Sequence, residues 1–103
     1  MTAFVGNGRL ADISRVVQLT LIRDEAELSL SLKLHEVGSN TQVELQFHNV
    51  SDLRFRGECT ELSELVLLIA EDRSSHGWEG VRFVVKDYEE EFISFRCERI
   101  ERS

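Results

Sequence analysis

Three histidines are the first residues of this chain whose type could support metal binding or acid–base chemistry. His35 and His48 fall on the polar positions of two alternating segments, so both belong to one face of an expected sheet. The register derived below sets His35 opposite Gln42, which is six residues and therefore about 20 Å from His48. Two ligands of one metal ion cannot be that far apart. We predict that both are solvated surface side chains.

His76 lies in the run Ser74-Ser75-His76-Gly77, which has the composition of a loop. A Ser/His pair so close in sequence does not readily direct both groups at one reacting atom. The chain also has no Gly-x-Ser-x-Gly, glycine-rich phosphate loop, CxxC or HExxH sequence. The sequence therefore predicts no catalytic residue, no metal site and no cofactor.

The two cysteines are predicted to be reduced structural thiols. Cys97 continues the alternation of Ile93 and Phe95, which places it in the core as a small hydrophobic residue. Cys59 lies near Glu58 and Glu61, and a nucleophilic thiol needs a cationic neighbour instead. One bridge would not make a disulfide framework in a chain of this size.

An acidic run at residues 87–91, Asp-Tyr-Glu-Glu-Glu, follows the only tryptophan by nine residues. Its spacing does not resemble an EF-hand, and a charge run is most often a solvated face. An aromatic anchor inside an acidic rim, however, suits docking against a basic protein surface. The candidate partner-binding residues are Trp78, Glu79, Asp87, Tyr88, Glu89 and Glu90.

Strict alternation over residues 15–48 predicts a three-stranded antiparallel meander. Leucine takes every second position from 28 to 34, and apolar residues alternate in the same way over 17–21 and 43–47. A loop at 38–40 sets Leu34 opposite Val43, Leu32 opposite Leu45, Leu30 opposite Phe47 and Lys33 opposite Glu44. A tight turn at Asp24-Glu25 sets Leu21 opposite Leu28, Leu19 opposite Leu30 and Val17 opposite Leu32.

Further alternation predicts strands near 52–56, 81–86 and 93–98, with no fixed register for the last hairpin. Residues 61–71 fit either a helix capped by Thr60 or a strand buried on both sides, and their β-branched content favours the strand. About seven strands make an all-β fold, an antiparallel sandwich or roll. The alternative is α+β with one short helix near 61–71.

Composition narrows the class of protein. The 103 residues suit one domain, 1–103, with one core. The net charge of −7 argues against a nucleic-acid partner, and no apolar run approaches the length of a membrane span. The start of the chain lacks the pattern of a signal peptide, so we expect a cytoplasmic protein.

Two runs carry a resemblance to known proteins: Gly77 to Cys97, and Phe47 to Arg54. Together with the strand pattern of the first half, they resemble a group of small bacterial β-proteins similar to immunity proteins of polymorphic-toxin systems. The resemblance covers about residues 10–101 and brings no catalytic signature. It implies a compact cytoplasmic β-protein that neutralises a cognate toxin.

Three hypotheses for the function follow. The first is a non-catalytic protein-binding domain, an immunity protein whose acidic surface meets a basic toxin. The second is a structural β-module that self-associates into a homo-oligomer through a nearly neutral sheet face, made of Gln18, Thr20, Ser29, Ser31, Gln42 and Gln46. The third is a ligand-binding or catalytic β-roll with an internal cavity, and no residue of the sequence supports this hypothesis.

Overall fold

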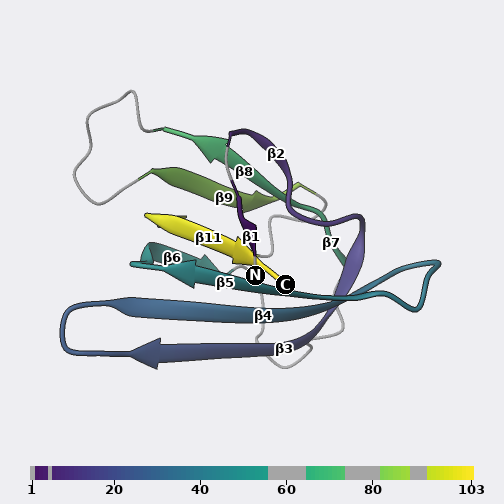
Figure 1. The fold of residues 1–103 in the computed structure, drawn as a ribbon, viewed down its shortest axis with the longest axis horizontal. Coiled ribbons are helices and arrows are strands. Elements are labelled where there is room, and N and C mark those ends of the chain that lie inside the picture. Colours follow the sequence, from purple (N-terminus) through teal and green to yellow (C-terminus); the bar gives the residue numbers. More distant parts are fainter. Residues whose placement is uncertain (1, 5, 56–64, 74–81, 89–92) are drawn as a thin grey trace.

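The computed structural model describes residues 2–4, 6–55, 65–73, 82–88 and 93–103, and these form an all-β sandwich without a helix (Figure 1). The predicted fold class is confirmed. Strands of the first sheet are, in spatial order, β1 (Thr2–Ala3), β11 (Arg99–Arg102), β5 (Gln42–His48), β4 (Leu28–Glu36), β3 (Ser14–Arg23) and β7 (Leu65–Val66). Strands of the second sheet are β2 (Gly8–Arg9), β8 (Leu68–Asp72), β9 (Phe83–Asp87), β10 (Ile93–Cys97) and β6 (Ser51–Phe55).

The register between β4 and β5 is the one predicted. Leu30 pairs with Phe47, and Lys33 pairs with Glu44. Their apolar residues face inward: Leu28 is partly buried, and Leu30, Leu32, Leu34, Val43, Leu45 and Phe47 are at most 2% exposed. The alternation therefore specified this register, because a slip of one residue would turn every leucine to solvent.

The predicted register between β3 and β4 is wrong by two residues. Leu21 pairs with Leu30 rather than Leu28, because the turn spans the four residues 24–27 and is closed by the bond from Asp24 N to the carbonyl of Glu27, 2.8 Å. A bulge between Val16 and Gln18 then shifts the ladder again. It turns Val17 outward, where it is 49% exposed.

The second sheet supplies the register that the sequence left open. Phe95 pairs with Val85, and Cys97 pairs with Phe83. All four side chains point into the sandwich and are at most 2% exposed. The intervening residues of β9 and β10 therefore form the outer surface of this sheet.

The segment with two predicted conformations is extended over the described residues 65–72, as favoured, and forms two strands, β7 and β8, with Leu67 between them; residues 61–64 lie outside the described residues. It leaves the first sheet after Val66 and enters the second at Leu68. At the break, the buried carboxylate of Asp87 accepts a hydrogen bond from Leu67 N, 2.9 Å, and Tyr88 N donates to the Leu67 carbonyl, 2.9 Å. These two bonds satisfy the backbone groups that the crossover removes from the ladders.

Two other crossovers meet at one corner of the sandwich. The chain passes from β5 to β6 through Asn49 and Val50, and from β10 to β11 through Glu98. Glu98 N donates to the His48 carbonyl, 2.9 Å, and Asn49 Nδ2 donates to Glu98 Oε2, 3.1 Å. Bends of this kind let one strand belong to two sheets and close the corner.

The core lies between the inner faces of the two sheets. Phe47 of the first sheet meets Phe95 of the second edge to face, with ring centroids 4.7 Å apart. Phe4 meets Phe83 in the same way at 5.9 Å. Both pairs cross from one layer to the other, so they lock the sheets together in the arrangement that aromatic rings prefer.

Candidate functional site

A cationic groove crosses the outer face of the second sheet, over β6, β10 and β9. It encloses about 320 Å³. The side chains that we call the cationic groove are Arg54, Arg73, Lys86 and Arg96, with Asp52 and Ser94 between them. Each comes from an outward position of its strand or directly follows the strand, so the alternation that buries the core also assembles the groove.

Asp52 organises two of the four cations. Its Oδ1 lies 3.3 Å from Nε of Arg54, and its Oδ2 lies 3.9 Å from Nε of Arg96. Asp52 has a left-handed φ of 51°, and the register between β6 and β10 shifts beside it. The irregularity is a bulge, a device that re-aims side chains at a sheet surface.

The groove keeps an excess of positive charge. Arg73 contacts Glu71 at 2.6 Å, so within the described ranges two carboxylates, Asp52 and Glu71, face four cations. Among the described residues, no carboxylate lies within ion-pair distance of Lys86, which is exposed. The pairs of Asp52 are open to water: the Arg54 side chain is 74% exposed, and the Arg96 side chain 42%. Ion pairs so exposed contribute little to stability and can rearrange around a ligand.

A larger hollow of about 530 Å³ adjoins the groove and shares Arg54, Lys86 and Ser94 with it. Its other lining residues are Phe55, Asp87, Tyr88 and Ile93. Tyr88 is 56% exposed, so its ring is accessible at the surface of the hollow. The groove and this aromatic hollow together offer cations beside an apolar surface.

The structure describes two of the six residues predicted to bind a partner, Asp87 and Tyr88. Trp78, Glu79, Glu89 and Glu90 lie outside the described residues. Tyr88 is exposed at the aromatic hollow.

Asp87 is only 1% exposed, and its carboxylate is turned inward to Leu67. It therefore holds the crossover of the strand and does not present its charge at the surface.

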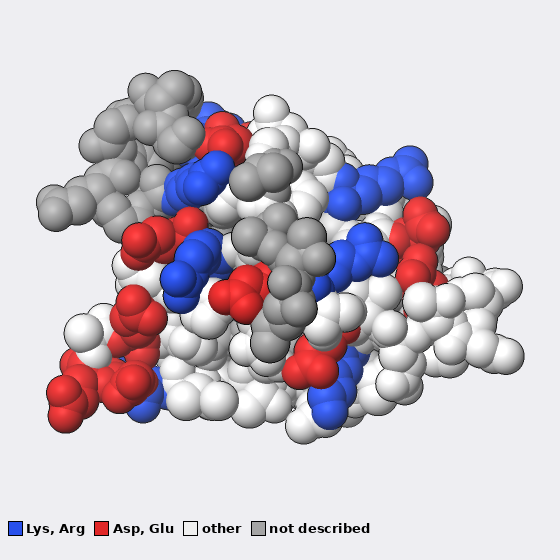
Figure 2. Space-filling model, in the orientation of Figure 1, with Lys and Arg blue, Asp and Glu red and all other residues white. Residues whose placement is uncertain are grey.

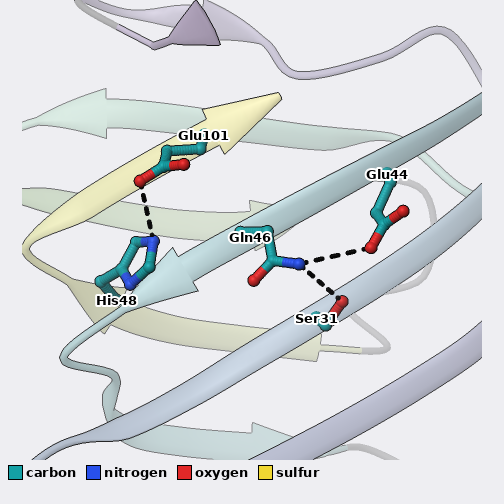
Figure 3. A network of polar contacts seen from close by, with 5 residues as sticks. All are labelled: Ser31, Glu44, Gln46, His48 and Glu101. Carbon is teal, nitrogen blue, oxygen red and sulfur yellow. Dashed lines mark hydrogen bonds and ion pairs between the residues drawn. The ribbon is translucent and has the colours of Figure 1, made fainter. Parts of the chain in front are cut away.

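The outer face of the first sheet is polar and largely satisfied by its own contacts. Gln46 Nε2 donates to Ser31 Oγ, 3.5 Å, and to Glu44 Oε1, 3.3 Å, while His48 Nε2 lies 3.1 Å from Glu101 Oε1 (Figure 3). A shallow hollow of about 230 Å³ lies on the same face between β3, β4 and β5. Because its amides and hydroxyls bind one another, this face offers a ligand fewer donors than the cationic groove does.

The titratable groups give no sign of a metal centre or a reactive thiol in the described part of the chain. No group of three or more His, Cys, Asp or Glu side chains there could hold a metal ion. His35 pairs with Gln42, as predicted, far along the strand from His48. Burial raises the pKa of the Cys97 thiol to about 12, so it stays protonated and inert. No helix among the described residues is long and apolar enough to cross a membrane.

The family of the chain follows from comparison with known proteins. The family model of the immunity protein PIM8 matches residues 9–103, which include every strand from β3 to β11. The chain belongs to the immunity protein PIM8 family. The resemblance to immunity proteins noted in the sequence is thereby confirmed. No curated protein and no solved structure matches this PIM8-family chain.

In this PIM8-family chain, sequence reasoning missed the four cations of the groove. A signal was present: Arg54, Lys86 and Arg96 each occupy the polar position of an alternating segment. The three segments could not be joined from sequence, because β6 lies beside β10 only through a crossover and the β9–β10 register was open. Charge that is scattered in the sequence is therefore gathered by the fold.

Proposed function

We propose that this protein is a non-catalytic immunity protein, which binds a cognate protein toxin in the cytoplasm and blocks its activity by occupying it. The observation that carries the proposal is the match of residues 9–103 to the immunity protein PIM8 family. The rigid two-layer core supports it, since a preorganised surface loses little entropy on binding.

The charge distribution favours a toxin with a basic contact surface. Residues 56–64, 74–81 and 89–92 contain seven of the 19 acidic residues of the chain and one of its 12 basic residues. In the described residues, Asp24, Glu25 and Glu27 gather at the turn between β3 and β4, at the lower left of Figure 2, whereas the two signs are interleaved elsewhere on that face. Complementary charge would speed the encounter and make it sensitive to salt.

The test is protection from the toxin encoded beside this protein. Cells that produce the toxin should survive when they also produce the wild-type chain, and the two purified proteins should form a stable complex. Adding the chain to the toxin in steps separates occupancy from catalysis. Occupancy predicts that activity falls in proportion and ends at one equivalent, whereas an enzyme would remove it at a small fraction of one equivalent. Failure of both protection and binding would overturn the proposal.

A self-associating β-module is the second candidate, and one observation favours it. Large apolar side chains are exposed along β3: Val17 is 49% exposed, Leu21 44% and Ile22 58%. Among the described residues, β7 pairs with the outer edge of β3 only at Ser14 and Arg15. A strand edge with exposed apolar side chains is a typical site for strand pairing between chains. Sedimentation that gives a monomer at every concentration would exclude this candidate.

A further inference from the structure

We propose that the cationic groove of the second sheet binds a carboxylate-rich segment of the protein partner, with an apolar side chain of that segment in the adjoining aromatic hollow. The inference rests on the proposed function, because it names the surface and the chemistry by which the toxin would be held. The groove would be a positively charged contact with the toxin, in addition to the acidic contact proposed above.

The groove has the positive charges that would attract carboxylates. In a chain with a net charge of −7, four cations gather in one depression, and among the described residues Asp52 and Glu71 are the carboxylates within ion-pair distance of them. Arginine offers two parallel N–H donors, which match the two oxygens of a carboxylate, and Lys86 adds a point charge with no described carboxylate within ion-pair distance. The groove therefore has the donors that an Asp or Glu side chain would accept from.

Asp52 and the backbone around it place these donors close together. Asp52 lies between Arg54 and Arg96, at 3.3 Å and 3.9 Å, and so fixes the spacing of two cations that would otherwise repel each other. Its left-handed φ of 51° and the adjoining register shift show a local backbone arrangement that a regular strand would not adopt. Because the ladder bends here, both guanidinium groups reach the same depression.

The shape of the surface suits a segment that carries both an acidic and an apolar side chain. The groove of about 320 Å³ and the hollow of about 530 Å³ share three lining residues and therefore lie side by side. Tyr88 is 56% exposed in the hollow, beside Phe55 and Ile93. An extended segment with an acidic residue next to a bulky apolar one would match the cationic and aromatic parts in turn.

The overall negative charge of the chain would restrict the binding of an acidic segment to the groove. An acidic segment is repelled by most of a protein with a net charge of −7, so favourable binding has to come from a local site. A partner that presents a basic surface to the acidic turn of Asp24, Glu25 and Glu27 and a carboxylate-rich segment to the groove would be held in one orientation.

The probe for the groove is a hexaglutamate peptide, titrated into the isotopically labelled full chain at low salt and followed by NMR. We expect chemical-shift changes to centre on Lys86, Ser94 and Arg96 and to weaken as salt is added. Lys86→Gln combined with Arg96→Gln should lower the affinity about tenfold, because two charge-assisted contacts are lost. The matched control is Lys33→Gln on the first sheet, an exposed lysine outside the groove, which should bind as wild type does.

The outcomes separate the groove from the proposed function. Shift changes elsewhere, or equal affinity of the double variant and wild type, would overturn the inference. Tighter binding of a short single-stranded DNA at the same residues would also overturn it, because the groove would then prefer phosphate.

In a second arm, the toxin replaces the peptide. A toxin that binds wild type and both variants equally leaves the proposed function standing and overturns the groove as its contact. A toxin that binds none of the three, while hexaglutamate binds the groove, overturns the proposed function alone.

Discussion

The buried carboxylate of Asp87 should be one of the largest polar contributions to the stability of this fold. It is 1% exposed and accepts a hydrogen bond of 2.9 Å from Leu67 N, at the residue where the chain passes from one sheet to the other. Asp87→Ala leaves that buried N–H without this acceptor. A hydrogen bond to a charged group contributes about 1.5–3 kcal/mol, so we expect the free energy of unfolding to fall by about 2–3 kcal/mol.

Urea unfolding followed by circular dichroism measures this change. For a domain of this size, about 2 kcal/mol corresponds to a fall in Tm of about 8–16 °C. Asp87→Asn is the matched control, because its amide oxygen can still accept the bond from Leu67, and it should cost only about 1 kcal/mol. Amide exchange at Leu67 should accelerate in the alanine variant more than in the asparagine variant.

Two results would refute the reasoning. If Asp87→Ala unfolds within about 0.5 kcal/mol of wild type, the crossover does not need this acceptor. If the asparagine variant is as unstable as the alanine variant, the stabilisation comes from the charge of the carboxylate and not from its bond to Leu67.

Three further predictions concern the core and the exposed strand. The folded chain holds the pKa of Cys97 at about 12, above its ordinary value of 9.0, so the neutral thiol favours folding; this contribution is complete below pH 9 and is lost as the pH rises towards 12. As the pH rises from 9 to 12, the free energy of unfolding should fall by up to about 4 kcal/mol more in wild type than in Cys97→Ala. An equal fall in the two proteins would contradict this prediction. Phe47→Ala should lower the free energy of unfolding by about 3–5 kcal/mol, because the ring is fully buried against Phe95; a loss below about 1 kcal/mol would show that the interface repacks. Ile22→Lys should change stability by less than about 0.5 kcal/mol at a side chain 58% exposed, and should raise solubility if β3 associates with other chains.

The sequence determined the centre of the first sheet because one face of that sheet is buried. The leucines of β4 and the apolar residues of β5 admit one register, and Lys33 opposite Glu44 agrees with it. The hairpin of β3 and β4 was harder, since a four-residue turn and a two-residue turn both place like faces together. Val17 shows a second limit: an apolar residue at a bulge looks like core in the pattern yet is exposed.

The candidate site could be predicted only in part. Asp87 continues the alternation of Phe83 and Val85, so its inward position was readable, but its place in a run of acids suggested a surface residue. The cationic groove depends on the contact between β6 and β10, which the chain makes after crossing between sheets. No local pattern encodes a contact of that kind, because it arises from the topology of the whole sandwich.

The three short crossovers have a consequence for how the molecule opens. One residue, Leu67, joins β7 to β8; one residue, Glu98, joins β10 to β11; and two residues join β5 to β6. Unfolding of one sheet would also displace the connected strands of the other sheet. Partial unfolding of one layer alone should therefore be suppressed. Native-state hydrogen exchange should therefore find one cooperative unit, with nearly equal opening free energies for the central strands of both layers. Such a protein would present its surface either complete or not at all.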